Sequence, residues 1–176
     1  SKLGFVSKED GIECEQGFFL THGWDKKIPP RAIENLGTDF LFPEIKYKFH
    51  ACCHGLHSFL EALDEMKLEN NFNPETIEEI AIETNPSWLK VCNIEEPKTG
   101  LESKFSYKLT AAMSIYGKDT SNLDTYSDEI CFDDKLNNIR DKVRVIPNDN
   151  LSNTQSLISI KDGSSNVKNK HDLSDK

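Results

Sequence analysis

The sequence has no apolar run of the roughly 20 residues that a membrane-spanning helix needs. It also does not begin with the basic segment and following apolar stretch of a secretory signal. Positive charge is scarce as well, because 21 Lys and Arg stand against 30 Asp and Glu, a net charge of −9. A chain of that sign is poorly suited to a phosphate backbone. We therefore expect a cytoplasmic protein that binds neither membranes nor nucleic acids.

Regularly spaced cysteines are absent too. The cysteines are odd in number, and their spacing fits neither a disulfide framework nor paired Cys-x2-Cys zinc motifs. They are Cys14, Cys52, Cys53, Cys92 and Cys131. We expect them to be reduced thiols, as in a cytosol-like compartment.

The chain is long and apolar enough for one domain. Its 176 residues are 36% hydrophobic, which suffices to bury a core. Frequent Gly and Pro in residues 1–44 predict an irregular leading segment that arrives from an upstream domain. Residues 45–162 carry the regular patterns of the domain itself. Large apolar residues are rare in residues 163–176, which are expected to form a flexible tail.

Two helices and one strand have clear patterns. Apolar residues at offsets of three and four predict helices over residues 55–68 and 101–116. Alternation of apolar and polar residues predicts a strand over residues 76–83. Residues 88–92 fit either a second strand or an irregular loop. These patterns leave the remaining chain for short elements.

Short helices are expected over residues 123–130 and 133–140. Val143, Val145 and residues 157–160 predict two closing strands that pair with each other. Helices and strands thus come in separate runs, without the regular alternation of a doubly wound sheet. We predict an α+β fold, a small lid-type domain with helices packed on a mainly antiparallel sheet.

Residues 48–57 form the densest cluster of chemically active side chains. A lysine, three histidines and two cysteines precede or open the first helix. A helix start offers free backbone N–H groups and partial positive charge, so Lys48 and His57 could hold a carboxylate there. The alternative is that the cysteines are small buried residues and the histidines are partly solvated.

The same cluster could instead bind a metal through His50, His54 and His57. Adjacent cysteines chelate one ion poorly, and no acidic residue is spaced to complete the site. We therefore predict no metal.

Residues 97–108 form a second cluster, in which Lys98, Lys104 and Lys108 surround a glycine and several hydroxyl residues at a helix start. This arrangement also suits an anion. The alternative is a solvated lysine face that balances nearby glutamates. The presence of two such clusters together favours the functional interpretation.

The two clusters resemble signature stretches of the C-terminal domain of the 2-methylcitrate dehydratase family, also called the MmgE/PrpD family. The first stretch of that family has a Lys, a Cys and a helix-opening His, which correspond to Lys48, Cys52 or Cys53, and His57. The likeness covers about residues 4–163. Its other parts are residues 4–5, 16–18, 99–106, 111–112, 117–120, 141–145 and 160–163.

The resemblance implies a two-domain enzyme whose large helical domain lies upstream, so this chain alone is expected to be inactive. Members include dehydratases of tricarboxylates, a decarboxylase and an epimerase, and they use no metal or organic cofactor. They share proton movement at the carbon next to a carboxylate, and the lyase is expected to begin by abstracting that proton. We expect a lyase of a small polycarboxylate such as 2-methylcitrate. An epimerase, a decarboxylase and a non-catalytic remnant or assembly module remain alternatives. The resemblance also implies a possible homodimer, since family dimers form mainly through the helical domain.

Five residues are expected to serve this chemistry. Lys48 and Lys104 would clamp carboxylates, and His57 would orient or exchange a proton. Ser106 and Cys53 would contact the substrate.

The sequence departs from the family at two places. Leu109 stands where many members have a tyrosine, and the nearest phenol, Tyr107, is two residues early. His50 and Ala51 replace the usual Tyr and Pro before the cysteine. These departures indicate a divergent branch with its own substrate.

Overall fold

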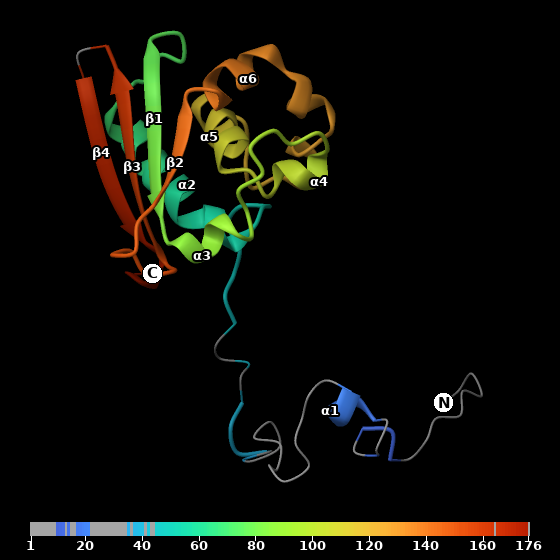
Figure 1. Ribbon diagram of the computed structural model, residues 1–176. Coiled ribbons are helices and arrows are strands. Elements are labelled where there is room, and N and C mark those ends of the chain that lie inside the picture. Colours follow the sequence, from blue (N-terminus) through green and yellow to red (C-terminus); the bar gives the residue numbers. More distant parts are fainter. Residues whose placement is uncertain are drawn as a thin grey trace. The chain divides into compact units, whose positions relative to one another are not determined.

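The computed structural model describes residues 10–12, 14, 17–21, 35, 37–40, 42, 45–163 and 165–175. The chain divides into two units, residues 1–46 and residues 47–176. In the first unit a short helix, α1, spans Phe18–Thr21 (Figure 1). Most of the leading segment expected over residues 1–44 lies outside the described residues.

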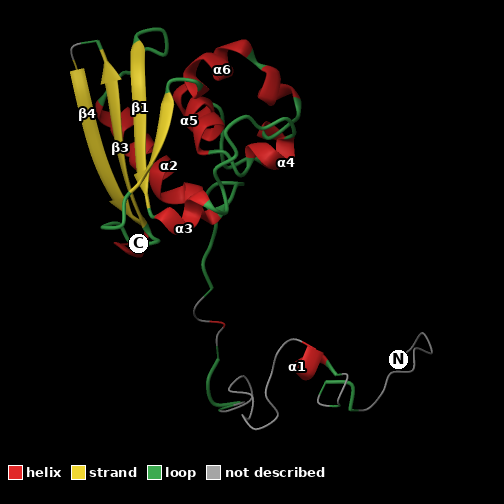
Figure 2. Ribbon diagram, viewed as in Figure 1, coloured by secondary structure: helices red, strands yellow, loops and turns green. Residues whose placement is uncertain are grey.

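A four-stranded sheet forms one layer of the second unit (Figure 2). Its strands are β1 (Ile77–Thr84), β2 (Val143–Pro147), β3 (Gln155–Asp162) and β4 (Ser165–Asp172). They lie in the order β2-β1-β3-β4. The β1–β2 pair is parallel, and the β1–β3 and β3–β4 pairs are antiparallel.

Alternating isoleucines explain why β1 and β3 lie at the centre. Ile80 of β1 lies opposite Ile160 of β3, and Ile82 opposite Ile158. All four side chains are fully buried, on the face of the sheet that meets the helices. Gly163 has φ 58°, a left-handed backbone that glycine adopts without strain, so β3 can turn directly into β4.

Helices cover one face of this sheet (Figures 1 and 2). The longest, α2 (His57–Glu69), follows the 3₁₀ turn η3 (His54–Leu56) and packs against β3 and β4. The helix α5 (Tyr107–Ile115) packs against α2, β2 and α6. The other elements are α3 (Pro86–Leu89), α4 (Gly100–Ser103), η4 (Leu123–Thr125), η5 (Glu129–Phe132), α6 (Asp134–Arg140) and η6 (Leu173–Asp175).

The core lies between α2, α5 and the sheet. Phe59, Leu60 and Leu63 of α2 are fully buried, as the three-and-four spacing predicts. The ring of Phe59 lies 5.3 Å from that of Tyr107, centroid to centroid, which joins α2 to α5. Burying one such side chain contributes about 1.5–3 kcal/mol. The helical layer is therefore fixed to the sheet by apolar packing.

The predicted fold class is confirmed, because helices pack on a sheet whose pairs are mostly antiparallel. The helix predicted over residues 55–68 and the strand over 76–83 are present as α2 and β1. Residues 143–145 and 157–160 lie in β2 and β3.

Two finer predictions need correction. Residues 88–92, which fitted either a strand or an irregular loop, form no strand: they lie at the end of α3 and in the turn after it. Asn85 caps α3 by accepting a hydrogen bond from the Ser87 amide, and proline follows it at the first helical position. The helix predicted over 101–116 is two helices, since Ser106 leaves the helical backbone and caps α5.

Two predictions about the C-terminal part of the chain also fail. The strands β2 and β3 do not pair with each other, because β1 lies between them. Most of the tail expected over residues 163–176 has regular structure, since residues 165–172 form β4 and residues 173–175 form η6. The edge position explains the missed signal: β4 turns only Val167, Asn169 and His171 toward α2, and most of these are polar.

Candidate functional site

Residues 48–57, here called the His-Cys loop, form one wall of the candidate site. The Ala51 amide donates to the Thr120 carbonyl at 2.8 Å, and the Cys53 amide donates to the Lys104 carbonyl at 2.9 Å. The first bond ties the loop to the chain after α5, and the second ties it to the end of α4. The structure thus brings together the two clusters that are separate in the sequence.

Gly55 is required where the His-Cys loop enters α2. A Cβ atom added there would lie 2.5 Å from Cε3 of Trp88 and 2.8 Å from Sγ of Cys92. The Tyr107 hydroxyl donates to the Gly55 carbonyl at 2.7 Å. Close packing and a buried hydrogen bond therefore fix the turn that precedes His57.

His57 opens α2 and is buried, with 1% of its surface exposed. Its ring centroid lies 5.2 Å from that of His50 and 5.1 Å from that of His54. Burial, and then the charges of His50 and His54, lower the pKa of His57 to about 4. The imidazole is therefore neutral at pH 7. Its Nε2 atom is buried with no hydrogen-bond partner in the described part of the chain.

His50 contacts Thr120 and Glu61. Its Nδ1 lies 2.7 Å from Oγ1 of Thr120, and its Nε2 lies 3.3 Å from Oε1 of Glu61. Both His50 and His57 are buried, so the interpretation of the histidines as partly solvated fits only His54.

Lys48, the first residue of the His-Cys loop, and Lys104, which follows α4, both lie near Cys52. The Lys48 ammonium donates to the Cys52 carbonyl at 3.1 Å, and Nζ of Lys104 lies 5.7 Å from the centre of the Tyr126 ring. Burial raises the pKa of the Cys52 thiol to about 12, and the charges of both lysines act in the opposite direction. Two cations from distant parts of the sequence therefore lie near one thiol.

The remaining predicted residues have mixed placements. Cys53 is half-buried beside Lys104. Ser106 is fully buried, and its hydroxyl accepts from the Leu109 amide at 3.2 Å as the cap of α5. This structural role accounts for the serine without a substrate.

The other two lysines of the second cluster form ion pairs. Lys98 lies 3.4 Å from Glu96, and Lys108 lies 3.1 Å from Glu95. For these two residues the solvated lysine face is the better interpretation.

Sequence reasoning missed two residues of this site. Tyr126 donates through its hydroxyl to the Thr120 carbonyl at 2.9 Å, and its side chain acts against the rise in the pKa of Cys52. Trp88 packs on Gly55. Neither aromatic residue belongs to a motif. For Tyr126, only the order of elements after α5 could have suggested that the chain returns to the His-Cys loop.

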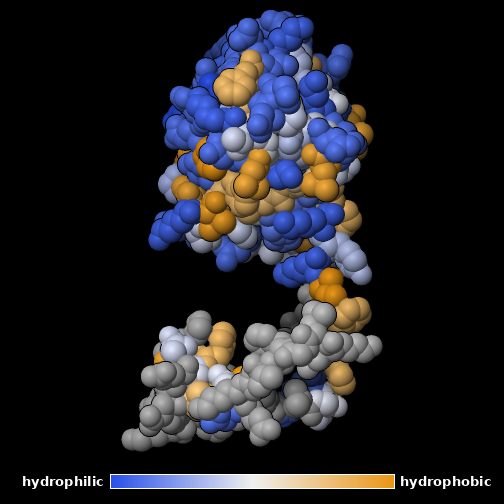
Figure 3. Space-filling model, turned by 90° about the vertical axis from the view of Figure 1, so that its right-hand side faces the viewer, coloured by the Kyte–Doolittle hydropathy of each residue, from blue (hydrophilic) through white to orange (hydrophobic). Residues whose placement is uncertain are grey.

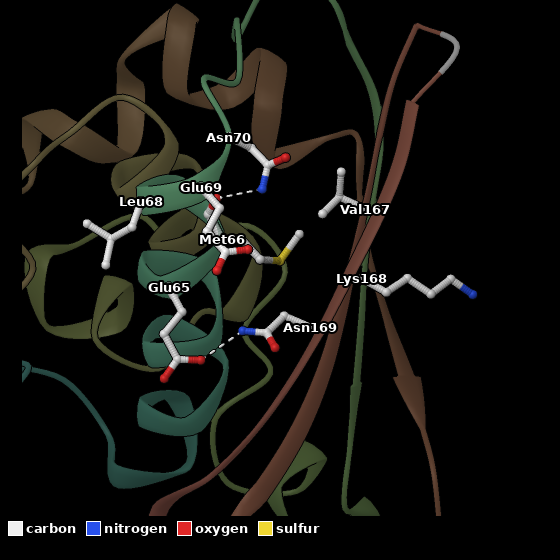
Figure 4. A pocket seen from close by; sticks show the side chains of 8 residues that line it. All are labelled: Glu65, Met66, Leu68, Glu69, Asn70, Val167, Lys168 and Asn169. Atoms are coloured by element: carbon white, nitrogen blue, oxygen red, sulfur yellow. Dashed lines mark hydrogen bonds between the residues drawn. The ribbon is translucent and has the colours of Figure 1, made fainter.

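Two cavities open on the second unit. One, of about 290 Å³, is lined by Phe49 and His50 of the His-Cys loop, together with Lys67 and residues 117–121. The other, of about 270 Å³, lies between α2 and β4 and contains none of the predicted site residues. In Figure 4, Glu65 faces Asn169 across this second cavity, and their side chains are 2.8 Å apart.

Among the described residues, no three His, Cys, Asp or Glu side chains are grouped so that they could hold a metal ion. The histidines of the His-Cys loop instead contact one another, Thr120 and Glu61. In the same part of the chain, no helix has the length and apolar character needed to cross a membrane.

The fold and site define a small α+β domain with a cationic, histidine-rich helix start beside a second, lysine-bearing turn. The family model of the MmgE/PrpD C-terminal domain matches residues 50–172 of the sequence, so the chain belongs to the MmgE/PrpD family. Lys48 lies two residues before the matched range. A comparison with curated proteins gave no match.

Proposed function

We propose that this chain is the small domain of a metal-independent lyase that removes water from a small polycarboxylate such as 2-methylcitrate. Family membership supports the class of enzyme. The observation that carries the proposal is that the charges of Lys48 and Lys104 both act on Cys52, in a loop whose His57 is buried and neutral.

The two lysines supply the positive charge that such a substrate needs. Proton abstraction next to a carboxylate leaves negative charge that spreads onto its oxygens, and a nearby cation stabilises that charge. Lys48 is exposed and Lys104 is half-buried, so both ammonium groups can meet a ligand. The acidic chain thus has a local cationic surface for an anionic substrate.

His57 serves this site as a positioning residue. Its ring is buried, and its pKa is affected by the backbone of Cys52, the residue whose carbonyl accepts from Lys48. Of the two roles expected for this histidine, orientation fits its burial better than direct proton exchange. It holds the backbone against which Lys48 rests, and its neutral form leaves Lys48 as the loop's cation.

The upstream helical domain is the proposed partner of this chain. Several large apolar side chains of the second unit are exposed, among them Leu101, Leu123 and Phe132 at 69%, 63% and 63%. Figure 3, seen from the side of α4 and α6, shows apolar side chains gathered on this face. Such a surface suits a domain that packs on another. A homodimer held mainly by the helical domain is proposed with it.

The test joins the chain to the helical domain encoded upstream and measures dehydration of 2-methylcitrate and citrate. Lys48→Ala is expected to lower the rate at least tenfold, because a contact with a developing charge is lost. Lys98→Ala, which removes an exposed lysine paired with Glu96, is the matched control and is expected to leave the rate unchanged. Full activity of Lys48→Ala would remove that residue from the site.

Product analysis separates the alternatives. An epimerase would begin with the same proton abstraction but yield an inverted centre, whereas a decarboxylase would release carbon dioxide. If no upstream helical domain is encoded and no carboxylic acid reacts, the chain is an assembly module.

A further inference from the structure

Lys104 differs from the other two lysines of residues 97–108. Lys98 and Lys108 form ion pairs with glutamates, whereas the Lys104 side chain forms none with a carboxylate of the described residues. Its backbone is fixed, because its carbonyl accepts from the Cys53 amide at 2.9 Å. Its side chain is half-buried on a flexible four-carbon stem. If the Lys104 ammonium has a fixed position, an uncharged neighbour must provide it.

That neighbour is the ring of Tyr126. Nζ of Lys104 lies 5.7 Å from the ring centre, within the roughly 6 Å over which an aromatic face attracts an ammonium. The ring is itself held in place, because only 6% of Tyr126 is exposed and its hydroxyl donates to the Thr120 carbonyl at 2.9 Å. The same carbonyl accepts from the Ala51 amide of the His-Cys loop at 2.8 Å. Tyr126 therefore shares an anchor with the loop to which the Lys104 backbone is bonded.

Backbone contacts keep the lysine and the ring together. The helix α4, which Lys104 follows, begins at Gly100. The Gly100 amide donates to Oδ1 of Asp128 at 2.7 Å, and a Cβ atom on Gly100 would lie 2.2 Å from the Tyr126 carbonyl oxygen. The start of α4 and residues 126–128 are therefore in direct contact.

An aromatic partner differs from a carboxylate in its effect on the ammonium. A carboxylate would compensate the charge of Lys104 and occupy its N–H donors. An aromatic ring attracts the ammonium through its quadrupole and leaves the positive charge in place for a bound anion. On a chain with a net charge of −9, such a partner keeps one cation available.

We propose that Tyr126 is a positioning residue of the candidate site, whose ring holds the Lys104 ammonium ready to bind a substrate carboxylate. The inference rests on the proposed function for the identity of the anion. The contact between ring and ammonium belongs to the 176-residue chain itself and can be measured without substrate. Failure of the contact and failure of the proposed function are therefore distinguishable.

The first test is NMR spectroscopy of the unmodified chain, with the Lys104 side chain assigned. Ring currents shift protons above an aromatic face upfield. We therefore expect the Hε protons of Lys104 upfield of those of Lys98, with NOEs to the Tyr126 ring. Lys104 protons at the same position as those of Lys98, without these NOEs, would overturn the proposal. Because this measurement needs no variant, misfolding of a variant does not obscure it.

Two variants separate the ring from the hydroxyl. Tyr126→Phe keeps the ring and is expected to keep the upfield shift of the Lys104 protons, whereas Tyr126→Leu is expected to lose it. The Thr120 carbonyl retains the Ala51 amide as a donor in both variants, so neither leaves it unpaired. An upfield shift that survives in Tyr126→Leu would show that another group holds the lysine and would overturn the proposal.

The second test joins the chain to the helical domain encoded upstream and measures kcat/KM for 2-methylcitrate. Tyr126→Leu is expected to lower kcat/KM by about two- to fivefold, the size of an exposed cation–π contact, and Tyr126→Phe is expected to restore most of it. In a Lys104→Met background, Tyr126→Leu should add little, because the ring then has no ammonium to hold. An equal loss in both backgrounds would mean that the ring acts only on the fold, which contradicts a positioning role. If the natural two-domain protein dehydrates no carboxylic acid, the proposed function fails, and the NMR result still decides whether Tyr126 holds Lys104.

Discussion

Burial of neutral His57 predicts a specific acid sensitivity. The pKa of His57 is lowered from 6.5 to about 4 in the folded chain, so between these values the unfolded chain binds more protons. Stability is then fully present above pH 6.5 and is lost as the pH falls toward 4. Lys48, His50 and His54 are the neighbouring basic groups that lower the pKa further.

The magnitude follows from the two pKa values. Lowering the pH from 7 to 5 should reduce the free energy of unfolding by about 2 kcal/mol through His57 alone. Urea unfolding followed by far-UV circular dichroism at several pH values measures the change. Other groups titrate over the same range, so the quantity to compare is the pH-dependent loss in the natural chain minus that in His57→Gln.

His171→Gln is the matched control, because this histidine is also buried but lies 2.9 Å from the Glu65 carboxylate. It reports the general effect of removing a buried imidazole from the α2 side of the sheet. If His57→Gln lost as much stability between pH 7 and pH 5 as the natural chain, the reasoning would be refuted. NMR titration of the His57 ring provides a second measurement. A midpoint near pH 6.5 would also contradict the lowered pKa of this histidine.

Two further predictions concern packing and capping. Gly55→Ala should lower the free energy of unfolding by about 1–3 kcal/mol, because its methyl group would overlap the Trp88 ring and the Cys92 sulfur; a variant as stable as the natural chain in urea would show that the neighbours move freely. Ser106→Ala should cost about 1 kcal/mol, because the Leu109 amide loses its cap. A much smaller loss in the same urea assay would mean that this cap contributes little.

Local patterns in the sequence were enough for the central elements. The apolar stripe of α2 and the alternation in β1 follow from side chains that must be buried on one face, so their periods are visible in the sequence. The edge strand β4 has no such pattern, because its inward positions include Asn169 and His171, which bond to Glu65 instead of filling an apolar core.

The site was predictable in part for a different reason. Both clusters are visible in the sequence, since each gathers charge at a helix start. Their contact depends on backbone hydrogen bonds from Ala51 and Cys53 to carbonyls more than 50 residues away, which no local pattern encodes. The roles of Tyr126 and Trp88 depend on the same long-range return of the chain, so they became visible only in three dimensions.

The order of the strands also bears on how the domain folds. The antiparallel partners β3 and β4 are joined by a short turn, so their pairing costs little chain entropy. The parallel partners β1 and β2 are separated by residues 85–142, which contain α3 to α6. We expect the hairpin to form early and the β1–β2 pair to form late, after the crossover helices have ordered. The candidate site, whose second wall lies in that crossover, would then be assembled among the last parts of the domain.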